Sequence, residues 1–235
     1  MLLASLSAAA SRHGLLVRGG FRPTAEDGVP ALPDGRNAAT LMLIGNAGPA
    51  MWRAFRAAPE RSRSDDALDA WTRRVVAEIA RGAGAHPLFP FEGPPYFPFQ
   101  RWAMRAEPVH PSPLGILIHP EFGLWHAYRA ALAFAEAVDL PEWKERARPC
   151  ESCERRPCLS ACPVGAFDGV SYAVHTCAAH LDTEAGRNCL DGGCRARDAC
   201  PVGAAWRYDL EQVRFHMAAF HAARGRATAG GEAPR

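Results

Sequence analysis

The chain has 235 residues, of which 48% are hydrophobic and 22% are charged, and its formal net charge is +2. This composition is typical of an ordinary soluble globular protein with room for one sizeable domain and a smaller one. Positive and negative residues are interspersed, so the charge pattern does not indicate a DNA-binding surface. No apolar run reaches the roughly 18–20 residues that a membrane span requires.

The first ten residues predict an amphipathic helix. Their apolar side chains recur at helical spacing, at Leu2, Leu3, Leu6, Ala9 and Ala10. The segment lacks the basic start and the long apolar core of an export signal. We therefore expect the helix to belong to the mature fold of a cytoplasmic protein.

Three strands are predicted in the region that precedes the first cysteine. Residues 14–17, 40–44 and 114–118 are short apolar runs. The second run is stopped by Gly45-Asn46-Ala47-Gly48-Pro49, which predicts a glycine turn at the end of a strand. We expect these strands to form a mixed sheet.

Apolar residues at helical spacing predict three further helices, over residues 65–81, 123–138 and 209–223. Ser64 is a candidate N-cap for the first of these, and Gly82 is a candidate stop signal.

A segment rich in proline and aromatic residues separates two of the predicted elements. Residues 86–99 contain five prolines, which predict neither a helix nor a central strand. A loop with this many apolar side chains is expected to pack against another part of the protein. It either covers the core or forms the wall of a cofactor pocket, since such pockets are often lined by aromatic side chains.

All eight cysteines lie between residues 150 and 200, in two runs of related pattern. The first run is Cys150-x2-Cys153-x4-Cys158-x3-Cys162, and the second is Cys177-x11-Cys189-x4-Cys194-x5-Cys200. Both continue as Cys-Pro-Val-Gly-Ala. Two-cluster ferredoxins hold 4Fe–4S clusters with three close cysteines and a distal Cys-Pro, whose thiolate binds the cluster of the other run. The pattern therefore predicts an iron–sulfur redox protein.

Crossing the ligands in this way gives two groups of four. The first cysteine set is Cys150, Cys153, Cys158 and Cys200, and the second cysteine set is Cys162, Cys177, Cys189 and Cys194. The gap between Cys153 and Cys158 is longer than in bacterial ferredoxins, and the second run is longer still. Two zinc sites or a disulfide framework are the alternatives. The repeated Cys-Pro endings favour clusters.

The sequence thus divides into an α/β (α+β) region over residues 1–147, a ferredoxin-like two-cluster module over 148–206, a C-terminal helix over 207–223 and a tail over 224–235. In the first region we expect a mixed sheet flanked by helices. The tail is rich in glycine and alanine and is predicted to be disordered.

The segment Leu114-Gly-Ile-Leu-Ile-His-Pro-Glu-Phe-Gly-Leu-Trp125 resembles a strand-to-helix segment of the MMACHC-like cobalamin-processing proteins and of the epoxyqueuosine reductases. In the reductases a cobalamin-binding region precedes a two-cluster module, which is the order found here. The segment from Cys177 to Glu184 resembles the isolated ligand segment of that module, which supports Cys177 in the second cysteine set. The acidic proton-donor motif and the C-terminal repeat domain of the reductases have no match, so no catalytic residue is predicted.

The resemblance implies a corrinoid-dependent reductase or cobalamin-processing enzyme, whose clusters relay single electrons from a low-potential donor to a bound cobalamin. The expected cobalamin contacts are Gly45, Asn46, Tyr96, His119, Phe122 and Trp125. His119 precedes a proline at a strand end, which is more typical of a turn residue than of a cobalt ligand. The alternative is a ferredoxin-like electron carrier whose first region docks a partner and binds no cobalamin.

Overall fold

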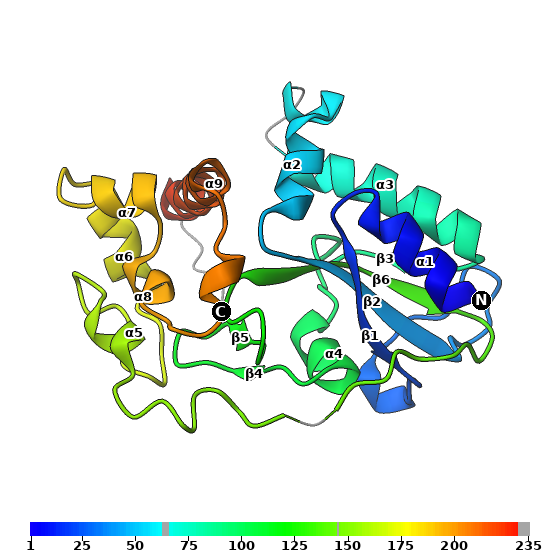
Figure 1. Cartoon of the computed structure of the whole chain (residues 1–235). Helices are drawn as coiled ribbons and strands as arrows, with labels where there is room; N and C mark the ends of the chain where they lie inside the picture. Colours follow the sequence, from blue (N-terminus) through cyan, green and yellow to red (C-terminus); the bar gives the residue numbers. More distant parts are fainter. Residues whose placement is uncertain (63–65, 145, 230–235) are drawn as a thin grey trace. The chain divides into compact units, whose positions relative to one another are not determined.

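The computed structural model describes residues 1–62, 66–144 and 146–229 (Figure 1). The chain divides into two compact units. The first unit is Met1–Val109 with His126–Arg146, and the second is His110–Trp125 with the chain from Ala147 onward. Residues 110–125, which the sequence places in the first region, therefore group with the cysteine-rich part of the chain.

A four-stranded sheet in the order β1-β2-β6-β3 forms the centre of the first unit. Its strands are β1 (Leu16–Phe21), β2 (Thr40–Ala47), β3 (His86–Leu88) and β6 (His126–Phe134). Each of the three pairings is antiparallel. The expectation of a mixed sheet is therefore wrong, and the sheet is antiparallel and flanked by helices.

Strand β6 occupies the stretch over 123–138 that the sequence analysis assigned to a helix, so that prediction is wrong. The strand pairs with β2 from Ala47–His126 to Thr40–Phe134, and with β3 on its other side. Its last five residues are buried. A strand buried on both faces shows no polar–apolar alternation, so its alanine-rich sequence resembles a helix. Pairing with distant strands overrides the local preference.

Strand β2 extends beyond its predicted end, and all eight of its residues are buried. Gly45 and Asn46 lie inside it, paired with Tyr128 and Ala127. They are therefore not part of a turn, as the sequence analysis expected. A Cβ on Gly45 would lie 2.3 Å from the carbonyl oxygen of Ala127, so only glycine allows β6 this close.

Helices cover both faces of the sheet. On one side lie α1 (Leu2–Ser11), α2 (Ala50–Arg56) and α3 (Ala67–Ala83), and on the other lies α4 (Phe99–Ala106) (Figure 1). Helix α3 confirms the predicted helix, but Gly82 does not stop it: the helix runs to Ala83 and is followed by Gly84, whose φ is 68°. The proposed cap Ser64 lies outside the described residues. Short 3-10 turns at Ala25–Asp27 (η1) and Pro59–Ser62 (η2) complete the unit.

The proline-rich segment over 86–99 is not wholly irregular, in contrast to the prediction. Its first residues form strand β3, and its last residue begins α4. Pro87 fits within β3 because that strand is at the edge of the sheet. Between these elements, the rings of Phe89 and Phe91 stack at 5.2 Å.

A hairpin and a group of short helices make up the second unit. The hairpin pairs β4 (His110–Pro111) with β5 (Leu117–Ile118). The predicted strand over 114–118 is therefore reduced to its last two residues, because the chain turns at Gly115, whose φ is 74°. The core of this unit consists of Leu114, Ile118, Leu124, Ala166, Phe167, Ala196 and Cys200.

The cysteines lie on or beside the short helices. These are α5 (Pro157–Ser160), α6 (Val174–Leu181), α7 (Arg187–Gly192) and α8 (Arg195–Asp198), followed by the 3-10 turn η3 (Ala204–Trp206) and helix α9 (Leu210–Ala229). Helix α9 confirms the predicted final helix and continues into the stretch predicted to be a disordered tail. Residues 230–235 lie outside the described part of the chain.

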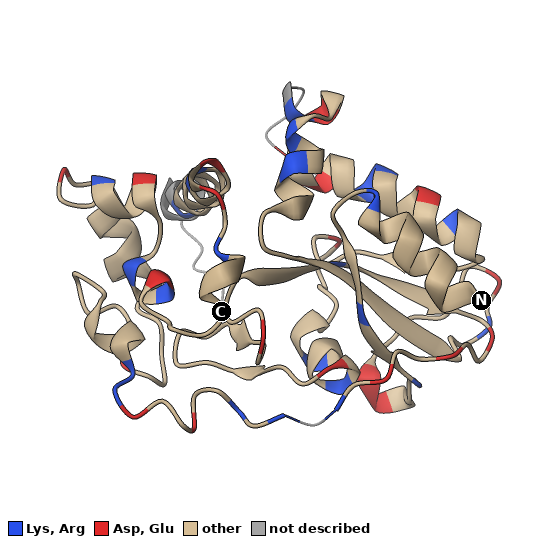
Figure 2. Cartoon of the chain, in the orientation of Figure 1, with Lys and Arg blue, Asp and Glu red and all other residues tan. Residues whose placement is uncertain are grey.

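No helix in the described part of the chain is long and apolar enough to cross a membrane. Basic and acidic residues are interspersed over both units (Figure 2).

Candidate functional site

The four cysteines of the first cysteine set line one cavity in the second unit. The other residues around it are mainly proline and aliphatic, and Arg156 is the charged residue among them. Cys200 belongs to the second run, and the chain after α8 brings it to the three cysteines of the first run. The structure thus brings together the four side chains that the crossed pattern groups.

The thiols of this set lie close enough to influence one another. Burial raises the pKa of the Cys150 thiol, and the charges of the other three cysteines raise it further. Burial also raises the pKa of Cys200; a backbone N–H of Val202 opposes this, while Cys158 and Cys153 add to it. Four thiolates in such surroundings need a shared positive charge, and binding a metal would displace their protons.

The second cysteine set gathers around α6, α7 and α8. Burial raises the pKa of the Cys194 thiol, and the charges of Cys177 and Cys162 raise it further, against backbone N–H groups of α8. Burial likewise raises the pKa of Cys189; Arg195 opposes this, and the same two cysteines add to it. Cys162 of the first run is therefore a neighbour of the cysteines in the second run.

The cysteine side chains were also compared with the geometry of a single-ion site. Among the described residues, no three His, Cys, Asp or Glu side chains converge as a site for one metal ion. The four ligands of a structural zinc site all bind the same ion. The thiolates of a cubane cluster bind different irons, so they stand farther apart.

The first Cys-Pro-Val-Gly-Ala sequence forms a turn that directs a backbone N–H at its cysteine, since the N–H of Ala166 donates to Cys162 Sγ at 3.3 Å. In the second, the backbone of Val202 opposes the rise that burial causes in the pKa of Cys200. The glycines of the two turns, Gly165 and Gly203, have φ values of 58° and 73°. Glycine adopts this left-handed conformation at little cost, which explains its place in both repeats.

His119 shapes the turn that follows β5. Its Nδ1 atom accepts hydrogen bonds from the N–H groups of Glu121 and Phe122, both at 3.1 Å. Its ring stacks on Phe122 with 4.2 Å between centroids. Because Nδ1 accepts these bonds, the neutral imidazole carries its proton on Nε2. Nδ1 is thus engaged in the turn, which is the role that the sequence pattern favours over cobalt ligation.

The turn containing His119 packs against the second Cys-Pro turn. A Cβ on Gly123 would lie 2.0 Å from the carbonyl oxygen of Val202, and a Cβ on Gly203 would lie 2.3 Å from the carbonyl carbon of Phe122. The two backbones therefore touch directly. This contact holds in place the turn that carries Cys200.

Arg197 ties the same segment to α8. Its Nε and Nη2 atoms donate to the carbonyl oxygen of Leu124 at 3.1 and 2.5 Å. Its guanidinium carbon lies 4.4 Å from the ring centroid of Trp125 and 4.8 Å from that of Tyr208, in cation–π contact with both. Trp125 Nε1 is buried and has no hydrogen-bond partner among the described residues.

The remaining predicted cofactor contacts lie in the first unit. Gly45 and Asn46 are buried in β2. The carbonyl oxygen of Asn46 accepts a hydrogen bond from Arg18 at 3.2 Å, so this residue serves the packing of the unit. Tyr96 is 63% exposed, in the loop before α4. His119, Phe122 and Trp125 therefore lie near one another in the second unit. Gly45, Asn46 and Tyr96 belong to the first unit.

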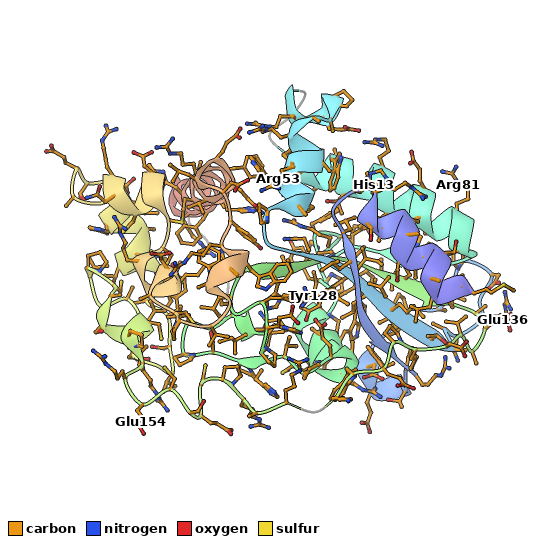
Figure 3. All side chains as sticks on the ribbon, in the orientation of Figure 1. His13, Arg53, Arg81, Tyr128, Glu136 and Glu154 are labelled. Carbon is orange, nitrogen blue, oxygen red and sulfur yellow. The ribbon has the colours of Figure 1, made fainter. Side chains whose placement is uncertain are left out.

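A buried ionic network in the first unit was not predicted from the sequence. Arg18 donates to both oxygens of Glu107, with Nε–Oε2 at 3.2 Å and Nη2–Oε1 at 2.5 Å. Tyr128, labelled in Figure 3, donates its hydroxyl to the same carboxylate. Burial raises the pKa of Glu107, although Arg18 and Tyr128 oppose it. The only sequence signal is a lone arginine directly after the apolar run Leu15-Leu16-Val17.

No protein-family model and no curated protein matches the sequence. Solved structures do match. The B12-trafficking protein CblC of C. elegans, a homologue of human MMACHC, has a TM-score of 0.52 at 14% identity, and the match covers 94% of each chain. An epoxyqueuosine reductase bound to a tRNA-Tyr stem loop has a TM-score of 0.51 at 15% identity, over 89% of this chain. The Bacillus subtilis epoxyqueuosine reductase has a TM-score of 0.50 at 17% identity, over 88%.

The chain shares the fold of these proteins. At such low identities the similarity shows the fold alone. The match spans 66% of the length of each of the two reductases, so the chain corresponds to about two thirds of them.

Proposed function

We propose that the chain is an iron–sulfur redox protein whose second unit holds two 4Fe–4S clusters. The observation that carries this proposal is the cavity where Cys200 joins Cys150, Cys153 and Cys158. A crossed ligand set is what the two-cluster pattern requires, and a zinc pair or a disulfide framework gives no reason for it. Its proline and aliphatic lining would keep water from the cluster.

When bound, 4Fe–4S clusters supply single electrons at low potential. The residues around the cysteines adjust that potential through hydrogen bonds and burial. Here the N–H of Ala166 donates to the Cys162 sulfur. Arg156 lines the cavity of the first cysteine set and places a positive charge beside it.

We further propose that the electrons serve a bound cobalamin, which makes the chain a corrinoid-dependent reductase or cobalamin-processing enzyme. Two findings support this. The fold is shared with a B12-trafficking protein and with epoxyqueuosine reductases. Trp125 also presents a buried N–H without a partner among the described residues, and the amide side chains of a corrin would be suitable acceptors. Because His119 Nδ1 is engaged in its turn, we expect cobalamin to bind without that nitrogen on cobalt.

A cobalamin titration of the reconstituted protein tests this part of the proposal. We expect the cobalamin spectrum to shift towards the base-off form and cobalamin to co-elute with the protein on gel filtration. Trp125→Phe should weaken binding by about tenfold, equivalent to the loss of one hydrogen bond. An unperturbed spectrum and no co-elution would show that the protein does not bind cobalamin.

The second candidate function is a ferredoxin-like electron carrier whose first unit docks a partner. The observation that favours it is the burial of Gly45 and Asn46 in β2, which withdraws two of the six expected cobalamin contacts. The cobalamin titration distinguishes the two candidate functions, because an electron carrier would hold its clusters but would not bind cobalamin.

A further inference from the structure

The loop between Cys153 and Cys158 contains a residue with an unusual backbone. Its sequence is Glu154-Arg155-Arg156-Pro157, which is longer than the matching gap of bacterial ferredoxins. Arg156 has a φ of 37° and a ψ of 55°, and it is the only non-glycine residue with a positive φ among the described residues. A side chain with a Cβ adopts this left-handed conformation at a cost in free energy. Strain of this kind is often kept at functional sites.

Arg156 lies at the cavity of the first cysteine set. The residues that line this cavity include all four cysteines of that set and no cysteine of the second set. Arg156 is the charged residue among them, and the others are mainly proline and aliphatic. It is also exposed, so it lies where the cavity opens to solvent. The residue before it, Arg155, is exposed too but does not line the cavity.

We propose that Arg156 raises the reduction potential of the cluster held by the first cysteine set. This inference rests on the proposed function. Reduction adds one electron from a low-potential donor to a cluster that four thiolates surround, and no bond forms or breaks. A cation beside the cavity stabilises the more negative reduced state more than the oxidised state. The effect is selective, because the cavity contains no cysteine of the second cysteine set.

A potentiometric titration followed by electron paramagnetic resonance tests the inference on the whole chain with reconstituted clusters. Arg156→Gln removes the charge and keeps a long polar side chain, whereas Arg156→Lys keeps the charge. The matched control is Arg155→Gln, which removes the charge of an exposed neighbour outside the cavity. The couple altered by Cys153→Ser is assigned to the first cysteine set.

We expect Arg156→Gln to lower the potential of that couple and to leave the other couple unchanged. Arg155→Gln should shift it less, and Arg156→Lys should keep it near the wild-type value. The shift should shrink at high ionic strength, because salt screens exposed charges. Equal shifts in the two glutamine variants, or an unshifted couple in Arg156→Gln, would overturn the inference while the proposed function stands. A wild-type protein without two couples would overturn both.

Arg156→Gly separates the charge from the backbone conformation, and it decides the matter should Arg156→Gln lose iron. Glycine adopts the left-handed conformation at little cost, so this variant keeps the loop and removes the charge. The inference predicts the iron content of the wild type and a lowered potential of the same couple. A potential that stays at the wild-type value would show that the charge does not act on the cluster.

Discussion

Gly165 and Gly203 hold the same position in the two Cys-Pro-Val-Gly-Ala turns, yet their surroundings differ. A Cβ on Gly165 would meet no atom within 4 Å, whereas one on Gly203 would lie 2.3 Å from the backbone of Phe122. Both have a positive φ, so alanine strains both backbones to a similar degree. The pair therefore isolates the contact with the turn after β5.

We predict that Gly165→Ala lowers the free energy of unfolding by about 1 kcal/mol, the cost of its left-handed conformation alone. Gly203→Ala should cost about 3 kcal/mol, because the clash with the backbone of Phe122 adds to that strain. It should also release iron faster to a chelator, since it displaces the turn that carries Cys200. Thermal melting and chelator-release rates measure the two effects. Equal behaviour of the variants would mean that the backbone contact contributes nothing.

Glu107 predicts a pH dependence of stability. Burial raises the pKa of its carboxyl above the ordinary 4.5, so the folded state holds the proton more tightly than the unfolded state. Stability contributed by this group is therefore full below pH 4.5 and falls as the pH rises through the folded pKa. Glu107→Gln removes this slope.

Urea unfolding of wild type and Glu107→Gln over a pH series checks this prediction. The stability of the wild type relative to the variant should be highest at pH 4.5 and below and should fall as the pH rises through the folded pKa. An advantage that grows with pH would show that the carboxyl has a lowered pKa instead.

At the scale of elements, the two Cys-Pro turns are predicted to serve each other's run. Cys200→Ala should damage the cluster built mainly by Cys150, Cys153 and Cys158, because Cys200 lines their cavity. Cys162→Ala should damage the other cluster, since Cys162 lies near Cys189 and Cys194. Electron paramagnetic resonance after reduction identifies which signal is lost. Loss of the signal from the mutated run itself would refute the crossed arrangement.

Elements with a clear local signal could be predicted from the sequence. Helix α3 has a regular apolar stripe of Leu68, Trp71, Val75 and Ile79, and the structure buries these four side chains. Strand β6 could not be predicted, because its alanine-rich sequence gains its structure from pairing with β2 and β3. The same applies to Gly45, whose turn-like sequence serves the close approach of Ala127.

At the scale of the whole molecule, part of the candidate site could likewise be predicted from the sequence and part could not. The cysteine sets follow from spacing, because cluster ligation fixes how cysteines recur along a chain. Most of the contacts made by the segment His119–Trp125 could not be predicted from spacing. In the structure His119 bonds to its own turn, Gly123 meets the second Cys-Pro turn, and Trp125 stacks on Arg197. The last two contacts join residues far apart in sequence, and no local pattern encodes them.

The central claim is that the second unit holds two cubane clusters. Iron and acid-labile sulfide analysis of anaerobically reconstituted protein tests it most directly. The account predicts about eight iron and eight sulfide per chain. Four of each would leave one cysteine set without a cluster. Abundant zinc without sulfide, in protein produced with ample iron, would contradict the claim and favour two zinc sites.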